Sequence, residues 1–303
     1  MEIEGGKNDE ERDEEERKEG AFNPGSRAIA KRSIYELGDT KHWSEKKAEE
    51  MTERDWRIFR EDHDIIIKGG RVPKPMKEWD DKLLPDFIMK AIRKLGFTKP
   101  TPIQMQGIPI GLARRDMIGL APTGSGKSAA FMIPLIMFLN SLPPIDEKTL
   151  HDGPYAIVLA PTRELVIQLH KDFEKLAQYT KLRASAVVGG RSAEEQAFTI
   201  RKGVEVIIAT PGRLKDALES RYTVLNQCSY VIIDEADRMV LDLGFEEALK
   251  EVLDAIPATN LKSEEESVAE IQEAITKAGE KIYRVTHMFS ATMTPQIETI
   301  ARK

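Results

Sequence analysis

The stretch YVIIDEAD, residues 230–237, decides the fold of this chain. Four apolar residues are followed directly by Asp234 and Glu235, which is typical of a buried parallel strand that delivers acids to its C-terminal edge. An edge of this kind can hold a hydrated magnesium ion. A plain acidic turn is the alternative, but charge at the mouth of a buried sheet is costly unless it is used. The stretch therefore predicts an α/β fold with a functional sheet edge.

A second stretch, APTGSGKS at residues 121–128, indicates a phosphate-binding loop. It lies between an apolar run and a helical pattern, the context that such a loop needs. Gly124 and Gly126 would let the backbone approach phosphates. Lys127 would bridge the β- and γ-phosphates, and Ser128 would ligate magnesium. The strict pattern has glycine in place of Ala121, and a simple glycine-rich turn is the alternative.

The two stretches together predict a nucleotide triphosphatase. Asp234 would hold magnesium through water, and Glu235 would orient or deprotonate the attacking water. Upstream, the segment GFTKPTPIQ at residues 96–104 ends in Gln104. A glutamine amide can donate and accept at the same time, which matches N6 and N7 of adenine. Gln104 is therefore a candidate adenine reader, although a polar residue after a Pro-Thr-Pro turn could equally be unremarkable.

The hydrophobic pattern from residue 76 onward predicts strands that alternate with helices. This alternation implies βαβ units and a mostly parallel sheet flanked by helices. The expected buried strands are 117–120, 156–160, 184–188, 206–209, 230–233 and a run around 288–289. The expected helices are 83–95, 127–140, 163–178, 193–202, 212–219 and 245–256. A polar insertion with one amphipathic helix is expected over 258–284.

Composition sets limits on the function. The chain has 303 residues, 41% of them hydrophobic, and a net charge of −6. Residues 1–20 carry ten acids and four bases, so the remainder is balanced and gives no electrostatic support for a nucleic-acid partner. Without an apolar run of membrane-spanning length or a signal peptide, the chain is expected to be soluble and not secreted. Its single cysteine, Cys228, allows neither an internal disulfide nor the usual zinc thiolates.

The region before residue 76 is expected to be an extension rather than a domain. Residues 1–20 are predicted to form an acidic disordered tail, and residues 21–75 an extension with short helices. One short helix is expected over 46–51 after Ser44, and another is expected to start at Thr52 and Asp55. Trp43 and Trp56 lie in this charged stretch. They are explained equally well by docking on a partner and by burial against the chain's own lobe.

Three further strand ends carry groups that commonly contact a nucleic-acid backbone. They are PTRE at 161–164, the pair Gly189-Gly190, and TPGR at 210–213. Each offers hydroxyls, backbone N–H groups or an arginine. None offers an aromatic stacking platform, and each alone is an ordinary turn or cap. Ser290-Ala291-Thr292 ends the last expected strand and could bridge to Asp237.

Taken in order, these segments resemble the first RecA-like lobe of the DEAD-box RNA helicases, over about residues 76–303. Members of that family usually carry alanine at the position of Ala121. The resemblance implies a RecA-like P-loop NTPase lobe that uses ATP and Mg²⁺, with Lys127, Asp234 and Glu235 as catalytic residues. It implies ATP contacts from Trp79, Phe97, Gln104, Thr123, Gly124, Ser125, Gly126, Lys127 and Ser128. It implies RNA contacts from Pro161, Thr162, Arg163, Gly189, Gly190, Thr210, Pro211, Gly212 and Arg213. It also implies coupling between the two sites through Asp237, Ser290 and Thr292.

A narrower resemblance lies in the flanking sequence. HWSEKK at 42–47, MTERDWRIFRED at 51–62, KGG at 68–70, GPYAI at 153–157 and the insertion before Ser290 resemble the spliceosomal DEAD-box helicase of the U5 snRNP. This resemblance implies pre-mRNA splicing in the nucleus, with single-stranded RNA as a partner and spliceosomal proteins docking on residues 21–75. Four departures from the family pattern are Ser128 for threonine, Pro122, Val166 and one extra residue after Asp237.

The second lobe of the family, with its arginine-rich motif, is expected to be absent from this chain. The sequence thus predicts an ATP-dependent RNA helicase that is inactive or very weak as an ATPase without the second lobe. One alternative is a non-catalytic splicing scaffold that binds nucleotide without turnover. A DNA-acting RecA-like ATPase is disfavoured by the combination of Gln104 and Asp237.

Overall fold

The computed structural model describes residues 41–301 apart from positions 71, 81, 191 and 242 and segments 264–267, 269–270, 273–274 and 276–280. The chain divides into two compact units, Met1–Ile58 and Phe59–Lys303. The acidic tail and most of the helix expected within 258–284 lie outside the described residues. The division of the chain at residues 20 and 75 stays a prediction. No helix of the described residues has both the length and the apolar character to cross a membrane.

The larger unit is built on one sheet of six parallel strands in the order β1-β6-β5-β2-β4-β3. The strands are β1 (Met117–Leu120), β2 (Ala156–Leu159), β3 (Ala184–Val187), β4 (Val206–Ala209), β5 (Tyr230–Ile233) and β6 (Val285–Ser290). Their bounds agree with the sequence prediction to within a few residues. The predicted α/β fold, a mostly parallel sheet flanked by helices, is confirmed.

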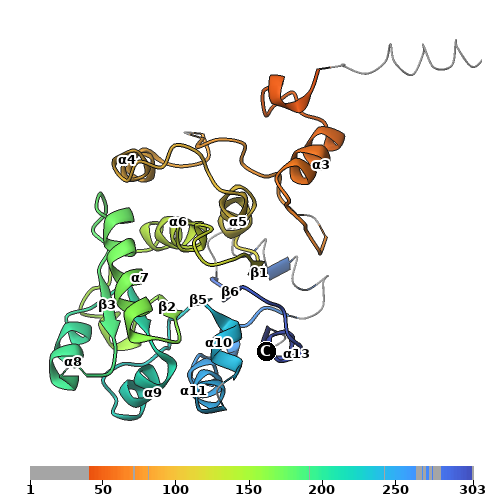
Figure 1. Ribbon diagram of the computed structural model, residues 1–303. Helices are drawn as coiled ribbons and strands as arrows, with labels where there is room; N and C mark the ends of the chain where they lie inside the picture. The colour runs from red at the N-terminus through yellow and green to blue at the C-terminus, as the bar shows by residue number, and fades with distance from the viewer. Residues whose placement is uncertain are drawn as a thin grey trace, which may run out of the picture. The chain divides into compact units, whose positions relative to one another are not determined.

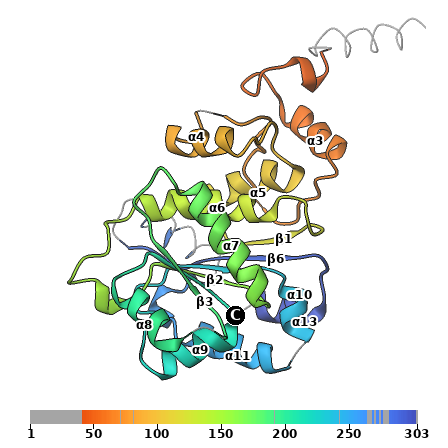
Figure 2. The same cartoon turned by 60° about the vertical axis from the view of Figure 1, so that its left-hand side comes forward.

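Two apolar cores cover the two faces of this sheet. Within β5, Tyr230 and Ile232 belong to one core while Val231 and Ile233 belong to the other, as the two-residue period of a strand requires. The first core is covered by α4 (Asp86–Lys94), α5 (Pro102–Leu112), α6 (Lys127–Asn140) and α7 (Arg163–Leu176). The second is covered by α8 (Ala193–Arg201), α9 (Pro211–Glu219), α10 (Ala236–Leu241), α11 (Leu243–Asp254) and α13 (Pro295–Ala301). Figures 1 and 2 show α5 and α6 on one side of the sheet and α9 and α11 on the other.

Helix α5 was not expected from the sequence, and its composition explains why. It is apolar on nearly every side and contains Pro109, so it has neither an amphipathic period nor an uninterrupted helical pattern. Pro109 has no N–H to donate to the Met105 carbonyl four residues earlier. The N–H of Met76 takes that place at 2.8 Å. The segment around Met76 is therefore hydrogen-bonded to α5.

The side chain of Gln106 strengthens this attachment of α5. Its Nε2 donates to the Pro73 carbonyl at 2.9 Å, and its Oε1 accepts from Arg60 Nε at 3.0 Å. Gln106 is buried, with 5% of its surface exposed, so both halves of its amide need such partners. Residues 60–76 thus fix the helix that also carries Gln104.

In the N-terminal unit one expected helix is present and one is not. Helix α3 (Glu53–Asp62) begins as expected, because Asp55 Oδ2 accepts from the N–H and the hydroxyl of Thr52 at 2.8 and 2.9 Å. The prediction of a helix over 46–51 was wrong. The structure has a short 3₁₀ turn at η1 (Trp43–Glu45), and residues 46–51 are not helical. Lys46 has an extended backbone, and its buried ammonium lies 3.1 Å from Asp55. That ion pair fixes Lys46 as the end of the turn rather than the start of a helix.

Candidate functional site

The parallel sheet brings all the segments singled out in the sequence to one edge. Because every strand runs in the same direction, the C-terminal ends lie together, with Leu120 beside Ser290 and Leu159 beside Ile233. The ends of β1, β6 and β5 carry the phosphate loop, residues 290–292 and Asp234. The ends of β2, β4 and β3 carry the three segments predicted to contact RNA. The edge therefore has two adjacent halves.

The phosphate loop turns sharply at two glycines. Gly124 and Gly126 have φ angles of 82° and 88°, in the left-handed region that favours glycine. A Cβ on Gly126 would lie 2.5 Å from Gln104 Nε2, so no larger residue fits there. Helix α6 begins directly after Gly126, which aims its N-terminal N–H groups at the loop.

Side chains of the loop are bonded to the loop's own carbonyls. The ammonium of Lys127 is buried and donates to the Ala121 carbonyl at 3.1 Å. The hydroxyl of Ser125 donates to the Pro122 carbonyl at 2.7 Å. Ser128, in the first turn of α6, is half-buried, whereas Thr123 is exposed. A phosphate would thus meet donors that are already held in place.

Gln104 links α5 to the phosphate loop. Its Oε1 accepts from the Thr101 N–H at 2.9 Å, and its Nε2 donates to the Gly126 carbonyl at 3.0 Å. Trp79 and Phe97 form a stacked aromatic pair, with ring centroids 6.4 Å apart. The indole N–H of Trp79 is buried and has no acceptor among the described residues. The amide predicted to read adenine is therefore rigidly positioned by the loop that would hold the phosphates.

The carboxylates after β5 lie in contrasting environments. Asp234 is 4% exposed, and burial raises its pKa from the ordinary 3.8 to about 6, even though Lys127 and the Glu235 N–H favour its charged form. Glu235 has a φ of 53°, a left-handed conformation that costs a non-glycine residue about 1 kcal/mol or more. Its carboxylate lies 3.1 Å from the guanidinium of Arg238. Strain and a buried charge at one strand end are typical of functional sites.

Replacement of Asp234 by asparagine should stabilise the nucleotide-free and metal-free protein at neutral pH. Between pH 4 and 6 the folded chain binds the Asp234 proton more tightly than the unfolded chain, so stability falls as pH rises through this window. Asp234→Asn removes this fall and keeps an oxygen for the Glu235 N–H. We expect the variant to gain about 1–3 kcal/mol over the wild type at pH 7.5 and almost nothing at pH 4. Urea denaturation at both pH values measures the difference, and an equal gain at both would contradict the buried carboxylate.

Residues 290–292 connect the two sides of the phosphate site. The Ala121 N–H donates to the Ser290 carbonyl at 3.0 Å. The Ser290 hydroxyl donates to the Thr292 carbonyl at 2.7 Å, and the Thr292 hydroxyl lies 3.4 Å from Asp237 Oδ2. The bridge to Asp237 suggested by the sequence is thus present as a contact. It joins the phosphate loop, the end of β6 and the start of α10.

The other half of the edge is held together by arginines. Arg163 Nη1 donates to the Gly189 carbonyl at 2.8 Å, and a Cβ on Gly190 would lie 2.4 Å from that nitrogen. Arg213 is paired with Asp216 at 2.7 Å, and its Nε is buried without a partner among the described residues. Thr162 caps α7 through the Leu165 N–H at 3.2 Å. Thr210, Pro211 and Gly212 form the start of α9, where Thr210 is the N-cap residue.

Sequence reasoning missed two residues that shape the site. Arg238 was not considered, although it lies three residues after Glu235 and pairs with it. Gln106 was overlooked, although Pro109 inside a helix predicts an unsatisfied carbonyl at Met105 and hence a neighbouring segment that supplies a donor. In the described residues no cluster of three or more metal-binding side chains occurs. Asp234 and Ser128 carry oxygens that could bind a magnesium ion together with phosphates, as in many nucleotide sites.

Comparison with known proteins adds to this geometry. The model of the DEAD/DEAH box helicase family matches residues 101–300. DEAD-box ATP-dependent RNA helicase 21 of Oryza sativa subsp. japonica is 52% identical over 276 residues, which make up 91% of this chain and 36% of that protein. The chain thus spans about a third of the length of this relative.

Two solved structures resemble the fold. The crystal structure of the RNA-helicase Prp28 from Chaetomium thermophilum bound to ADP has a TM-score of 0.70 and 46% identity, and the match covers 86% of this chain and 56% of that one. The crystal structure of the yeast DEAD-box splicing factor Prp28 has a TM-score of 0.74 and 38% identity, with 87% of this chain and 56% of that one covered.

Proposed function

Since this chain belongs to the DEAD/DEAH box helicases, we propose that it is the ATP-binding lobe of an ATP-dependent RNA helicase that acts in pre-mRNA splicing. One observation carries the proposal. The phosphate loop, the carboxylates after β5 and residues 290–292 converge on one half of a sheet edge, and the three segments predicted to contact RNA phosphates occupy the other half. This arrangement suits an enzyme that couples the binding and hydrolysis of a nucleotide to the binding of an RNA strand.

In this proposal the ATP phosphates lie in the loop 121–128 at the N-terminus of α6. Lys127 would exchange its bond to the Ala121 carbonyl for the β- and γ-phosphates, and Ser128 and Asp234 would hold magnesium, Asp234 through water. Bound magnesium would neutralise charge on the phosphates. Glu235 positions the attacking water and accepts its proton. Support comes from the related Chaetomium structure, which contains ADP.

Adenine would lie near Gln104 and the aromatic pair Trp79 and Phe97. The exposed face of Phe97, 38% accessible, offers a surface for the base. The amide of Gln104 can bond N6 and N7 of adenine, whereas guanine presents acceptors at both corresponding positions. The proposal therefore requires selection of adenine over guanine.

Removal of the Gln104 amide should weaken this selection. We expect Gln104→Ala to lower the preference for ADP over GDP by about tenfold, because a bidentate contact contributes roughly 1–3 kcal/mol of discrimination. Competition against a fluorescent ADP analogue measures both affinities. Gln178→Ala, at a glutamine beyond the C-terminal end of α7, is the matched control and should keep the preference. Equal binding of GDP and ADP by the wild type would contradict an adenine site.

The other half of the edge would bind single-stranded RNA through its phosphates and 2′-hydroxyls, largely without regard to sequence. Arg163 and Arg213 supply the positive charge, and Gly189, Gly190 and the start of α9 supply N–H groups. Thr292 and Asp237, in contact between the ends of β6 and β5 next to the RNA half, are proposed to couple RNA binding to the nucleotide. A second RecA-like lobe would complete both sites.

The splicing role would place the protein in the nucleus, with spliceosomal proteins docking on residues 21–75. The related yeast structure is of a splicing factor, which supports this assignment. The two tryptophans of the extension differ, because Trp56 is 2% exposed while Trp43 is partly exposed. Trp56 therefore serves the fold of the chain, and Trp43 is the better candidate for a docking residue.

Substitution of Trp43 should separate docking from folding. We expect Trp43→Ala to weaken association with purified U5 particles by roughly tenfold or more, since buried tryptophans are frequent interface hot spots. The affinity for ADP should stay unchanged, because the nucleotide edge is built entirely within the larger unit. Co-sedimentation with the particles measures the association. If the variant co-sediments with the particles as well as the wild type does, Trp43 is not part of the docking surface.

A further inference from the structure

The sheet edge opposite the nucleotide site contains a cavity of about 330 Å³, which we call the basal pocket. It is lined by three loops, 145–154, 200–204 and 221–224, which precede β2, β4 and β5. These strands are neighbours in the sheet, so the loops meet beneath its centre. The pocket is far from the phosphate loop in the fold and plays no part in the proposed ATPase. Its volume lies within the range of about 300–1,000 Å³ that is usual for ligand sites.

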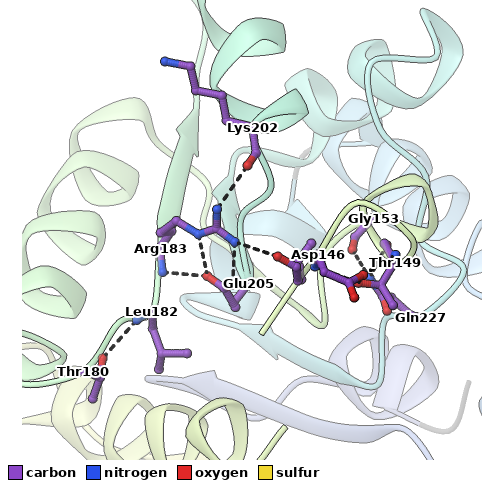
Figure 3. A network of polar contacts seen from close by, with 10 residues as sticks. Asp146, Thr149, Gly153, Thr180, Leu182, Arg183, Lys202, Glu205 and Gln227 are labelled. Carbon is purple, nitrogen blue, oxygen red and sulfur yellow. Dashed lines mark hydrogen bonds and ion pairs between the residues drawn. The ribbon is translucent and has the colours of Figure 1, made fainter. Parts of the chain in front are cut away.

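Hydrogen bonds and an ion pair hold the walls of the basal pocket (Figure 3). Glu205, 3% exposed, accepts from the Arg183 N–H at 2.7 Å and from the guanidinium at 2.8 Å. The same guanidinium donates to the Lys202 carbonyl at 3.1 Å and so fixes the loop that lines the pocket. Gln227 Nε2 donates to the carbonyls of Thr149 and Gly153. The pocket is therefore preformed, which lowers the entropic cost of binding.

The inner surface of the basal pocket is apolar and its rim is basic. The apolar lining comes from Ile145, Leu150, Pro154, Ile200, Val204 and Val224. The charged lining consists of Arg201, Arg221 and His151, with no carboxylate. Neither arginine forms an ion pair with any residue that the structure describes; Arg201 lies over the ring of Tyr222 at 5.8 Å. Two guanidinium groups at the mouth of an apolar pocket, both unpaired in the described part of the chain, favour a ligand that carries carboxylates.

The backbone at Arg221 indicates that its side chain is not needed for the fold. Helix α9 ends in a Schellman motif, with the Tyr222 N–H bonded to the Ala217 carbonyl at 2.8 Å and the Arg221 N–H to the Leu218 carbonyl at 3.0 Å. Arg221 occupies the left-handed position of this motif, with a φ of 54°, where glycine is usual. Glycine would therefore relieve strain at this position while it removes the charge.

The helix ends around the basal pocket argue against a polyanionic ligand. Helices α8 and α9 both finish at this edge, and helix C-termini carry partial negative charge. A nucleotide or an RNA backbone would bring several charges to these ends, whereas a mostly apolar ligand with one or two carboxylates would meet only the arginines. Phe198, 62% exposed, lies one turn before Arg201 on α8, and the Lys202 ammonium lies 4.3 Å from the centroid of its ring.

We propose that the basal pocket docks a linear peptide segment of a protein partner, in which one bulky apolar side chain fills the cavity and neighbouring carboxylates pair with Arg201 and Arg221. The partner would thus bind the edge away from ATP and RNA and leave both free. This docking function is separate from the ATPase and does not depend on it.

A selection from random peptides tests the proposal, because it requires no named partner. Phage-displayed random dodecapeptides are selected on the full 303-residue chain, with depletion on the double variant Arg201→Glu/Arg221→Gly. We expect enriched peptides to share a leucine, isoleucine or phenylalanine flanked by aspartate or glutamate. Failure to enrich any peptide over the double variant, or enrichment of peptides without carboxylates, would overturn the proposal.

Single variants then locate the bound peptide. A fluorescein-labelled peptide from the selection should bind the Arg221→Gly and Arg201→Glu variants about tenfold more weakly than it binds the wild type. Replacement of the peptide's apolar anchor by alanine should weaken its binding to the wild type to a similar extent. Lys171→Glu on α7, at an exposed lysine and with the same change of charge as Arg201→Glu, should alter binding less than twofold. Unchanged thermal unfolding and ADP affinity show that the variants are folded. An equal loss in Lys171→Glu, or displacement of the peptide by oligouridine, would mean that the surface attracts anions without a docking function and would refute the proposal.

Discussion

Assayed alone, the 303-residue chain should bind ATP but hydrolyse it about 10³–10⁵ times more slowly than a two-lobed helicase of its family. Phosphoryl transfer needs positive charge on the developing γ-phosphate, and an arginine finger supplies roughly 4–7 kcal/mol of the barrier reduction. The arginines near the described site are already engaged. Arg238 pairs with Glu235, Arg163 bonds Gly189, and Arg213 pairs with Asp216. We therefore expect the finger to come from a second lobe.

Steady-state ATPase assays with and without single-stranded RNA measure this deficit. RNA should stimulate the chain alone only weakly, because the proposed RNA cleft takes one of its two halves from a second lobe. Addition in trans of the second lobe of a close relative should raise the rate, and the same lobe with its arginine-rich motif replaced by alanines is the control. RNA-stimulated turnover near that of an ordinary two-lobed helicase, from this chain alone, would refute the assignment of the finger to a second lobe.

Lys127→Ala should abolish detectable ATP binding. Lys127 is 7% exposed, lies at the N-terminus of α6 and donates from its ammonium to the Ala121 carbonyl, so a phosphate in the loop would meet a largely desolvated cation. Loss of charge-assisted bonds at two phosphates should cost roughly 3 kcal/mol or more, which is a hundredfold or greater loss of affinity.

Calorimetry with ATP measures this loss, and Lys171→Ala on the exposed face of α7 is the control. Thermal stability should stay close to that of the wild type, because removal of a buried charge offsets the loss of one hydrogen bond to the Ala121 carbonyl. ATP affinity that is the same in Lys127→Ala and the wild type would remove the phosphate-loop assignment.

Five of the six strands could be predicted almost to the residue, while β6 (Val285–Ser290) was expected only as a run around 288–289. The reason for the agreement is physical. A parallel strand that is buried on both faces has a sequence of a few consecutive apolar residues, as in Tyr230–Ile233. Each such run in this chain is followed by a turn or by a helix cap. Their C-terminal ends must share one edge, so the neighbourhood of the phosphate loop and Asp234 also followed from the sequence. The strand order did not follow, because nothing local places β6 between β1 and β5.

The site details that could not be predicted depend on contacts between distant residues. Helix α5 is stabilised from outside, by the Met76 N–H and by Arg60 through Gln106, so its own sequence gives little helical signal. The left-handed backbone of Glu235 occurs in the turn from β5 into α10. It could not be predicted, because a glutamate is not a residue type that usually indicates this conformation. The basal pocket arises where three loops from different parts of the chain meet, and no single loop indicates it.

Hydrogen exchange with and without ADP and magnesium tests the central claim most directly, namely that the nucleotide lies at the edge formed by β1, β6 and β5. We predict slower amide exchange in three separate segments, residues 96–104, 121–128 and 290–292, because Gln104, the phosphate loop and Ser290 are joined by hydrogen bonds. The loops of the basal pocket, 145–154 and 221–224, should exchange as before. Protection of the basal loops without protection of residues 121–128 would contradict a nucleotide site at this edge.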